Sequence, residues 1–244
     1  MITYLKDLPI GSTVVYFQHK YPQHAFNGGV TYQQYPIGTF QVVWLIAAQD
    51  HFAPNTTTLW ADRPLELVEY GRPSWITGGN MKWLGTKLQK HCEAFYETLP
   101  QAFKERIIPV FLDNQDEPEY VSVFSYDELY YEGNYPERFL GYELDKSSNY
   151  YEIDYWTRTY DKSSENKSYV MGQFGELPNL RPHKEKFGFR PFVNLPNDVV
   201  VSTEKMFGHH VLYDTEPEEP AGFVKVDGIW KPLYGFKAPE GSVK

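Results

Sequence analysis

The stretch Phe187-Gly-Phe-Arg-Pro-Phe-Val-Asn-Leu195 says more about the fold than any other part of this sequence. Its alternating aromatic residues predict a core strand, and Gly188 lets a neighbouring backbone come close. Pro191 has no amide hydrogen, so we expect the strand to lie at a sheet edge or to bulge there. Arg190 lies among apolar residues, where a buried guanidinium needs several acceptors or a carboxylate. We therefore expect Arg190 to tie loops to the core, the alternative being a catalytic or ligand-binding arginine.

The composition is that of a globular protein. The chain has 244 residues, of which 41% are hydrophobic, enough for one large domain or one domain with an appendage. Aromatic residues make up 17%, which favours strand-rich folds and surfaces that recognise partners. The net charge of -9 and the pI near 5.3 argue against nucleic acid as a partner, because phosphate binding needs a basic face.

Cysteine usage and the N-terminus indicate where the chain is made. Cys92 is the single cysteine, so no intrachain disulfide can form, and no Cys/His spacing suggests zinc. The N-terminus lacks a basic region followed by an apolar run, and no segment is long enough to span a bilayer. We expect synthesis in a cytosol without export or membrane insertion, and we expect no metal and no cofactor.

The first third of the chain predicts a strand and then a hairpin. Residues 13–17 form a β-branched run, and residues 18–38 are expected to be a long loop. Residues 39–47 are almost continuously apolar, which predicts a central strand buried on both faces. A turn then leads to a partner strand at residues 57–60.

The periodicity changes to that of a helix between Asn80, a candidate N-cap, and Pro100. One helical stripe carries Met81, Leu84, Leu88, Cys92, Phe95 and Leu99. Cys92 is therefore interpreted as a core residue rather than a nucleophile, which would need an accessible, electropositive site. A second short helix is predicted at residues 101–108, and the capping box of residues 125–128 predicts a third.

The rest of the body alternates short strands and irregular segments. Residues 113–119 form an acidic loop, interpreted as a solvated turn with calcium binding as the alternative. Strands are expected at residues 153–158, 169–171 and 199–202, the last closing the sheet, whereas residues 172–186 are expected to be a loop. Short strands, long insertions and one main helix predict an α+β domain.

The C-terminal part changes character. Residues 1–213 are expected to form the domain, residues 214–222 an acidic linker with prolines, and residues 223–244 a separate segment. Asp227-Gly228 between two alternating runs predicts a hairpin. A lone hairpin is marginally stable, so its apolar residues are expected to dock on the body or on a neighbouring subunit. The candidate assembly residues are Val224, Val226, Ile229 and Trp230.

Motifs that carry chemistry give no catalytic constellation. The sequence holds no phosphate-binding glycine loop, nucleophile elbow, metalloprotease helix or paired cysteines. His209 and His210 are adjacent, so they point to different sides, and no acidic partner has ligand-like spacing.

Five motifs follow one another in an order that has a parallel elsewhere. They are Asp50-His-Phe52 with Thr56-Thr-Thr-Leu59, Lys82-Trp-Leu84, Ile107-Ile-Pro-Val110, Trp156-Thr-Arg158 and Gly188-Phe-Arg-Pro-Phe-Val-Asn-Leu195. This order resembles a domain of unassigned function found in bacteriophage virion proteins and some bacterial surface proteins. That domain is similar to the C-type-lectin-like fold, which formylglycine-generating enzymes and a phage tropism determinant also use. The resemblance covers residues 8–202 and implies structural roles for Trp156, Arg158, Gly188, Arg190 and Pro191.

The resemblance also implies a function. The C-terminal hairpin looks like short modules of phage tail proteins, so the chain is expected to be a non-enzymatic virion protein on the tail, baseplate or capsid. Its partners would be other virion proteins, further copies in a homo-oligomer, and a host-surface glycan or protein. One alternative is an enzyme of the formylglycine-generating type, although its paired cysteines are absent. Another is a bacterial surface carbohydrate-binding module, although Glu117-Pro-Glu119 matches the lectin calcium motif only in part.

Any ligand site is expected on the irregular segments that flank the late strands, because loops on a rigid scaffold usually carry binding. Rings there could stack on sugars, and polar groups could hydrogen-bond to them. The candidate residues are Tyr155, Tyr160, Asn166, Tyr169, Arg181 and His183. The competing interpretation is that the tyrosines pack inside the domain.

Overall fold

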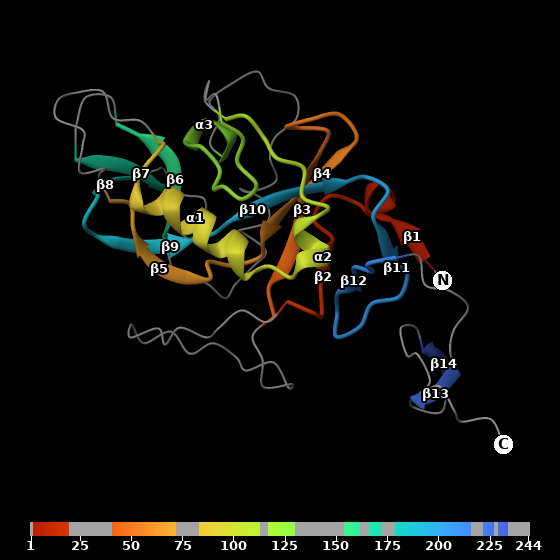
Figure 1. The fold of residues 1–244 in the computed structure, drawn as a ribbon. Helices are drawn as coiled ribbons and strands as arrows, with labels where there is room; N and C mark the ends of the chain where they lie inside the picture. The colour runs from red at the N-terminus through yellow and green to blue at the C-terminus, as the bar shows by residue number, and fades with distance from the viewer. Residues whose placement is uncertain are drawn as a thin grey trace.

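The computed structural model is strand-rich, with three α-helices among the residues it describes, in keeping with an α+β fold. It describes residues 2–19, 41–71, 83–112, 117–129, 154–161, 166–171 and 179–215, and the backbone of residues 222–226 and 229–233. Figure 1 shows two main sheets joined by the chain of β9 and β10, with α1 crossing in front.

The first sheet has the strand order β10-β4-β3-β2-β12. Its strands are β2 (Thr13–Val15), β3 (Val43–Gln49), β4 (Thr56–Ala61), β10 (Phe192–Pro196) and β12 (His210–Val211). The predicted central strand is β3, and it forms the predicted antiparallel hairpin with β4. All six residues of β4 are buried, so this strand lies in the interior of the domain.

The second sheet has the order β5-β9-β6-β7-β8. Its strands are β5 (Glu66–Glu69), β6 (Tyr155–Tyr160), β7 (Lys167–Met171), β8 (Asn179–Pro182) and β9 (Lys186–Phe189). The expectation of a loop over residues 172–186 is wrong in its second half, because β8 pairs antiparallel with β7 there. Alternation is hard to recognise in β8, since it is an edge strand whose first two residues are exposed.

The stretch 187–195 does not form one strand. Its first part belongs to β9 in the second sheet and its last part to β10 in the first sheet. The break falls at Arg190 and Pro191, where the missing proline amide prevents a continuous ladder. The Pro191 carbonyl accepts a hydrogen bond from the Ala61 amide at 2.8 Å, so the crossing remains tied to β4. These two residues therefore connect the two sheets.

Residues 199–202 were expected to close the sheet. The strand that forms there, β11 (Val200–Ser202), belongs to neither main sheet. It pairs antiparallel with β1 (Ile2–Tyr4), which a short 3-10 helix, η1 (Leu5–Asp7), follows. An isolated bridge between Val201 and Leu212 links this small sheet to the segment after β12.

The main helix, α1 (Lys87–Thr98), starts later than Asn80, which lies outside the described residues. Gly85 has a φ of 84°, and the Thr86 side chain caps the helix by accepting from the Gln89 amide at 3.0 Å. The helix ends before Pro100, as predicted. Of the predicted stripe, Leu88, Cys92, Phe95 and Leu99 are buried, whereas Leu84 is exposed before the helix and Met81 lies outside the described residues.

Two shorter helices follow. The α2 helix (Gln101–Lys104) is shorter than predicted, and α3 (Tyr126–Leu129) begins at the predicted capping box. The Glu128 amide donates to Ser125 Oγ at 3.2 Å, and the Ser125 amide donates to Glu128 Oε2 at 2.7 Å. The main core cluster packs α1 and α2 on the sheets, and a second one lies around Trp60.

The predicted C-terminal hairpin is present as β13 (Gly222–Val226) and β14 (Ile229–Leu233). It is a separate two-stranded sheet that pairs with no other described strand, and Figure 1 shows it beside the body. Val226 pairs with Ile229, whereas Trp230 pairs with Lys225. The four candidate assembly residues, Val224, Val226, Ile229 and Trp230, all lie in these two strands.

Asp214, expected to be the first linker residue, is bound to the body. Its carboxylate accepts from the Tyr16 hydroxyl at 2.6 Å, from Gln18 Nε2 at 2.8 Å and from an Arg106 nitrogen at 3.1 Å. The body therefore includes Asp214. Of the rest of the predicted linker, residues 216–221 lie outside the described residues and Gly222 begins β13.

Candidate functional site

The structure brings together two of the six predicted ligand residues, Asn166 and His183. They line an open cleft of about 510 Å³. The other described lining residues are Glu69, Gly71, Lys87, Pro182 and Lys184. The cleft therefore lies where the ends of β5 and β8 meet the starts of β7 and α1.

Backbone hydrogen bonds hold these segments in place. The His183 amide donates to the Asn166 carbonyl at 2.9 Å, and the Gly71 amide donates to the His183 carbonyl at 3.1 Å. Gly71 has a φ of 67°, and a Cβ there would come within 2.5 Å of the Lys87 side chain. Any other residue at this position would clash where the chain after β5 passes the start of α1. The backbone of Gly71 and His183 is therefore a fixed part of the cleft wall.

Charged and polar groups line the cleft. Lys87 Nζ lies 2.5 Å from Glu69 Oε2, and this hydrogen bond and charge lower the pKa of Glu69, with a smaller effect of Lys186. His183 is buried, stacks on Tyr70 at 4.8 Å and shares a hydrogen bond of 2.9 Å with Ser168 Oγ. Ser168 has no exposed surface, so this serine cannot attack a substrate. The cleft can offer hydrogen bonds and ammonium groups to a polar ligand.

The predicted tyrosines do not line this cleft. Tyr155 is buried, with the Arg190 guanidinium 5.1 Å from its ring centre. Tyr160 packs against the core, and Tyr169 stacks on Tyr126 at 4.9 Å. This geometry fits packing better than ligand stacking.

Arg181 is half-buried, and its guanidinium lies 5.8 Å from the ring centre of Phe187. It is not among the described residues that line the cleft. Arg181 is therefore only a neighbour of the cleft, next to Pro182 in β8.

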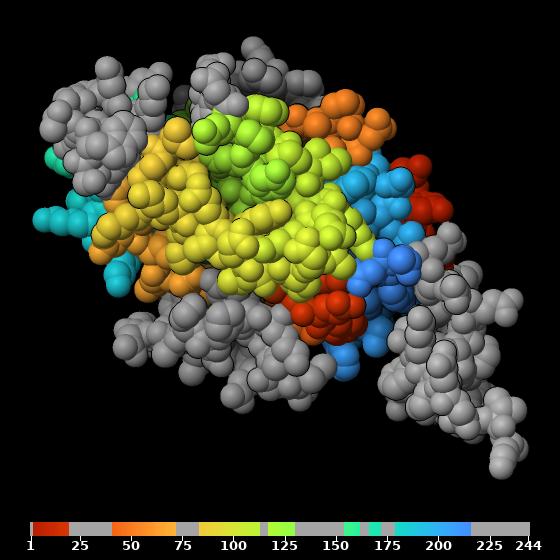
Figure 2. Space-filling model, viewed as in Figure 1, coloured from red at the N-terminus to blue at the C-terminus, as the bar shows by residue number. Residues whose placement is uncertain are grey.

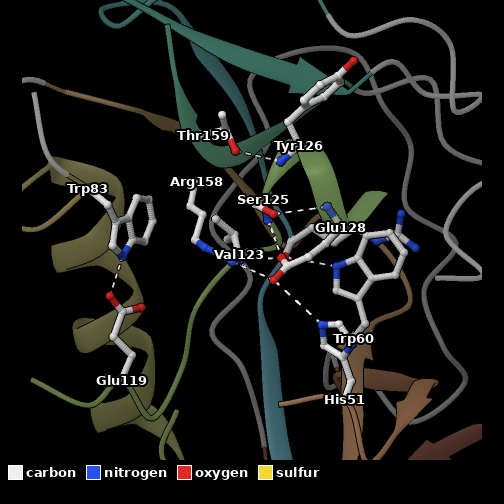
Figure 3. Close-up of polar contacts among 11 residues, drawn as sticks. His51, Trp60, Trp83, Glu119, Val123, Ser125, Tyr126, Glu128, Arg158 and Thr159 are labelled. Carbon is white, nitrogen blue, oxygen red and sulfur yellow. Dashed lines mark hydrogen bonds and ion pairs between the residues drawn. The ribbon is translucent and has the colours of Figure 1, made fainter. Parts of the chain in front are cut away.

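Figure 3 shows a separate polar centre in the interior, where Arg158 and Glu128 face each other. The Arg158 guanidinium binds both Glu128 oxygens, at 2.5 and 2.6 Å, and also donates to the Val123 carbonyl at 3.1 Å. His51 Nε2 lies 3.9 Å from Glu128 Oε1. Burial alone would raise the pKa of Glu128, but Arg158, His51 and the Ser125 amide together lower it to about 2. This pair joins α3 to β6.

Sequence reasoning missed the pairing of Arg158 with Glu128, although it named each residue separately. The capping box identified Glu128 and the Trp156-Thr-Arg158 motif identified Arg158. The two lie 30 positions apart with residues 130–153 between them outside the described structure, so no local pattern joins them.

Backbone carbonyls and an aromatic ring hold the Arg190 guanidinium. Its Nε donates to the Ala61 carbonyl at 2.9 Å and an NH2 group donates to the Asp62 carbonyl at 3.0 Å. Its guanidinium carbon lies 3.4 Å from the ring centre of Trp60, a cation–π contact. With 3% of its surface exposed, Arg190 lies in the interior, where a structural role is favoured.

The remaining motif residues are also interior. Trp156 is buried and donates from Nε1 to the Val68 carbonyl at 2.8 Å. The Gly188 amide donates to the Asp154 carbonyl at 2.8 Å, and a Cβ on Gly188 would lie 2.6 Å from the Pro64 side chain. Gly188 is thus the close backbone approach that the sequence predicted.

Neither Cys92 nor the neighbouring pair His209 and His210 forms a reactive site. Cys92 is 1% exposed, and burial raises the pKa of its thiol, which disfavours the thiolate. His209 Nδ1 contacts Thr13 Oγ1 at 2.8 Å, whereas His210 Nδ1 contacts the Ser202 carbonyl at 2.7 Å. Within the described ranges, no three His, Cys, Asp or Glu side chains gather to hold a metal ion.

Of the acidic loop, residues 113–116 lie outside the described ranges. Glu119, at the end of the loop, is buried, and its Oε1 accepts a hydrogen bond from the Trp83 indole.

No helix in the described part of the chain is long and apolar enough to cross a membrane. Comparison with protein-family models, with curated proteins and with solved structures finds no match to the chain.

Proposed function

We propose that this chain is a non-enzymatic bacteriophage virion protein, on the tail, baseplate or capsid, whose body binds a host-surface ligand. The observation that carries the binding part is the cleft of about 510 Å³ with Asn166 and His183 in its wall. Loops and strand ends on a rigid scaffold are where binding sites usually lie. The motif order described above leads us to propose further that the α+β body is a C-type-lectin-like domain.

The carboxylate, guanidinium and thiol groups that an enzyme could use are held in the interior of the domain. Glu128 is bound by Arg158, Arg190 by backbone carbonyls, and the Cys92 thiol is buried. These contacts favour a structural role for the groups that an enzyme would use. In particular, a protonated, buried Cys92 does not favour the formylglycine-generating alternative.

The C-terminal hairpin supports the assembly part of the proposal. It pairs with no other described strand, and a two-stranded sheet alone is marginally stable in water. Asp214 fixes the root of the connecting segment through Tyr16, Gln18 and Arg106. We propose that the hairpin binds a neighbouring subunit or another virion protein.

Electron microscopy of purified particles with an antibody to this chain tests the proposal. Gold label at one defined position on the particle is the expected result. Label confined to the bacterial cell surface would instead favour the carbohydrate-binding module. A chain truncated after Pro220 should keep the melting temperature of the body but fail to join particles. Normal incorporation of that truncated chain would contradict the role given to the hairpin.

A further inference from the structure

The cleft carries a local positive charge, opposite in sign to that of the whole chain. Lys87 and Lys184 line it, and Glu69 is the carboxylate among its described lining residues. The charged residues next to this lining in sequence or in strand register are Lys167, Arg181, Glu185 and Lys186. Cationic side chains therefore outnumber carboxylates here, although the net charge of the chain is -9. An excess of one sign in a cleft attracts ligands of the opposite charge.

The two lysines of the lining come from different segments. Lys87 is the first residue of α1, and Lys184 lies in the turn between β8 and β9. Figure 2 shows the start of α1, in yellow, close to β5, in orange, and to the segment of β8 and β9, in cyan, at one end of the body. Because a lysine ammonium sits on a flexible stem, a ligand in the cleft can be approached by both groups at once.

The ion pair at the cleft can exchange its carboxylate for a ligand. Lys87 Nζ lies 2.5 Å from Glu69 Oε2, and both side chains are open to solvent. An exposed pair of this kind contributes little to stability, so Lys87 can turn toward an anion at little cost. Glu69 competes with that anion for the same ammonium group.

Arg181 adds a guanidinium beside the cleft. Its guanidinium carbon lies 5.8 Å from the ring centre of Phe187, and its buried Nε has no hydrogen-bond partner among the described residues. Arg181 pairs with Ser168 in the register of β7 and β8, and Ser168 Oγ shares a hydrogen bond with His183. Since side chains two positions apart share one face of a sheet, Arg181 lies on the face that carries His183. Its charge therefore adds to that of the lysines at the cleft.

From these groups we infer that the cleft binds a small phosphate-bearing ligand, an inference that rests on the proposed function because it names the chemistry recognised at the same site. A phosphate group offers acceptor oxygens in several directions, so ammonium groups from two segments can bind it together. The exposed Asn166 amide can donate a further hydrogen bond. The acidic remainder of the chain still disfavours nucleic acid, which needs an extended basic face.

Isothermal titration calorimetry of the purified full chain with sodium tripolyphosphate tests the inference. The wild type should bind, and more weakly as NaCl is added, because salt screens the exposed charges. Lys87→Gln/Lys184→Gln should weaken binding by about tenfold or more at an unchanged melting temperature. The matched control, Lys6→Gln/Lys205→Gln, removes the same charge from exposed positions beside β1 and β11, at the opposite end of the body from β8 in Figure 1, and should bind like the wild type.

A second variant should change the affinity in the opposite direction. Glu69→Gln removes the carboxylate that competes for Lys87, so tripolyphosphate should bind about twofold or more tighter than to the wild type. A purely structural role for the pair of Lys87 and Glu69 would not produce tighter binding.

Three results would overturn the inference: no binding of tripolyphosphate by the wild type, equal affinity of Lys87→Gln/Lys184→Gln and wild type, and weaker binding by Glu69→Gln. Competition on host cells separates this inference from the proposed function. Cell binding that persists in saturating tripolyphosphate would overturn the inference and leave the proposed function standing. A chain that binds tripolyphosphate in the cleft but binds no cells would keep the phosphate chemistry and remove the proposed function.

Discussion

Two ion pairs in this molecule differ in burial, one in the interior and one at the cleft proposed as the binding site. The Arg158–Glu128 pair is interior, with side chains 4% and 14% exposed, whereas those of the Lys87–Glu69 pair are 65% and 30% exposed. The interior pair has further donors around it, including the Ser125 amide. The pair at the cleft is exposed to solvent. A buried pair becomes very destabilising when one partner is lost, whereas an exposed one contributes little to stability and can exchange its partner for a ligand.

The largest effect is expected for Arg158→Met. The change leaves the Glu128 carboxylate buried without its partner, which should lower the free energy of unfolding by about 3–5 kcal/mol. Denaturant unfolding of the purified variant measures this loss. The double variant Arg158→Met/Glu128→Leu should recover part of it, since no unpaired charge remains. Equal stability of Arg158→Met and wild type would show that the pair is not structural.

Acid should act on the same pair, with a slightly smaller effect. The pKa of Glu128 in the folded chain is about 2, against an ordinary 4.5. A lowered pKa contributes stability above pH 4.5, and this contribution is lost as the pH falls from 4.5 toward 2. The loss is about 3 kcal/mol, because one pKa unit corresponds to about 1.4 kcal/mol. Unfolding measured from pH 6 to pH 2.5 should show it in the wild type and not in Glu128→Gln, and a matching decline in both would refute the assignment.

A medium effect is expected for Arg190→Met. The Ala61 and Asp62 carbonyls lose their donors and Trp60 loses its cation, which should lower stability by about 1–3 kcal/mol. For a chain of this length each kcal/mol lowers the melting temperature by about 2–4 °C. Thermal unfolding followed by circular dichroism measures the shift. An unchanged melting temperature with lost ligand binding would give Arg190 a binding role instead.

The smallest effect on stability is expected at the exposed pair. Lys87→Met keeps the aliphatic stem that lies against Gly71 and removes only the charge beside Glu69. The melting temperature should stay within error of the wild type, while binding of a cleft ligand should weaken. Lys90→Met, an exposed lysine on the same helix that is not among the described cleft residues, is the matched control. A clear drop in melting temperature for Lys87→Met would remove the distinction between the two pairs.

Local signals in the sequence predicted the local structure. The apolar run that became β3, the capping box of α3 and the Asp227-Gly228 hairpin are each encoded by neighbouring residues. The start of α1 was placed too early because Gly85 and the Thr86 cap decide it, rather than the apolar stripe.

Relations over a long range could not be predicted in this way. The division of residues 187–195 between two sheets depends on the partners β4 and β5, which lie more than a hundred positions earlier. The cleft likewise joins Gly71 and Lys87 to Asn166 and His183. The sequence identified the last two by their chemistry alone, since only the pairing of β7 with β8 brings them beside α1.

The central claim, that the cleft is the recognition site of a binding protein, is tested most directly by binding of the labelled full chain to host bacterial cells. Asn166→Ala/Lys184→Ala is the variant to compare, because both residues are exposed and Asn166 holds His183 only through its backbone carbonyl. We predict saturable binding of the wild type, and binding weaker by about tenfold for the variant at an unchanged melting temperature. Equal binding of the two proteins, or no binding of the wild type, would contradict the account.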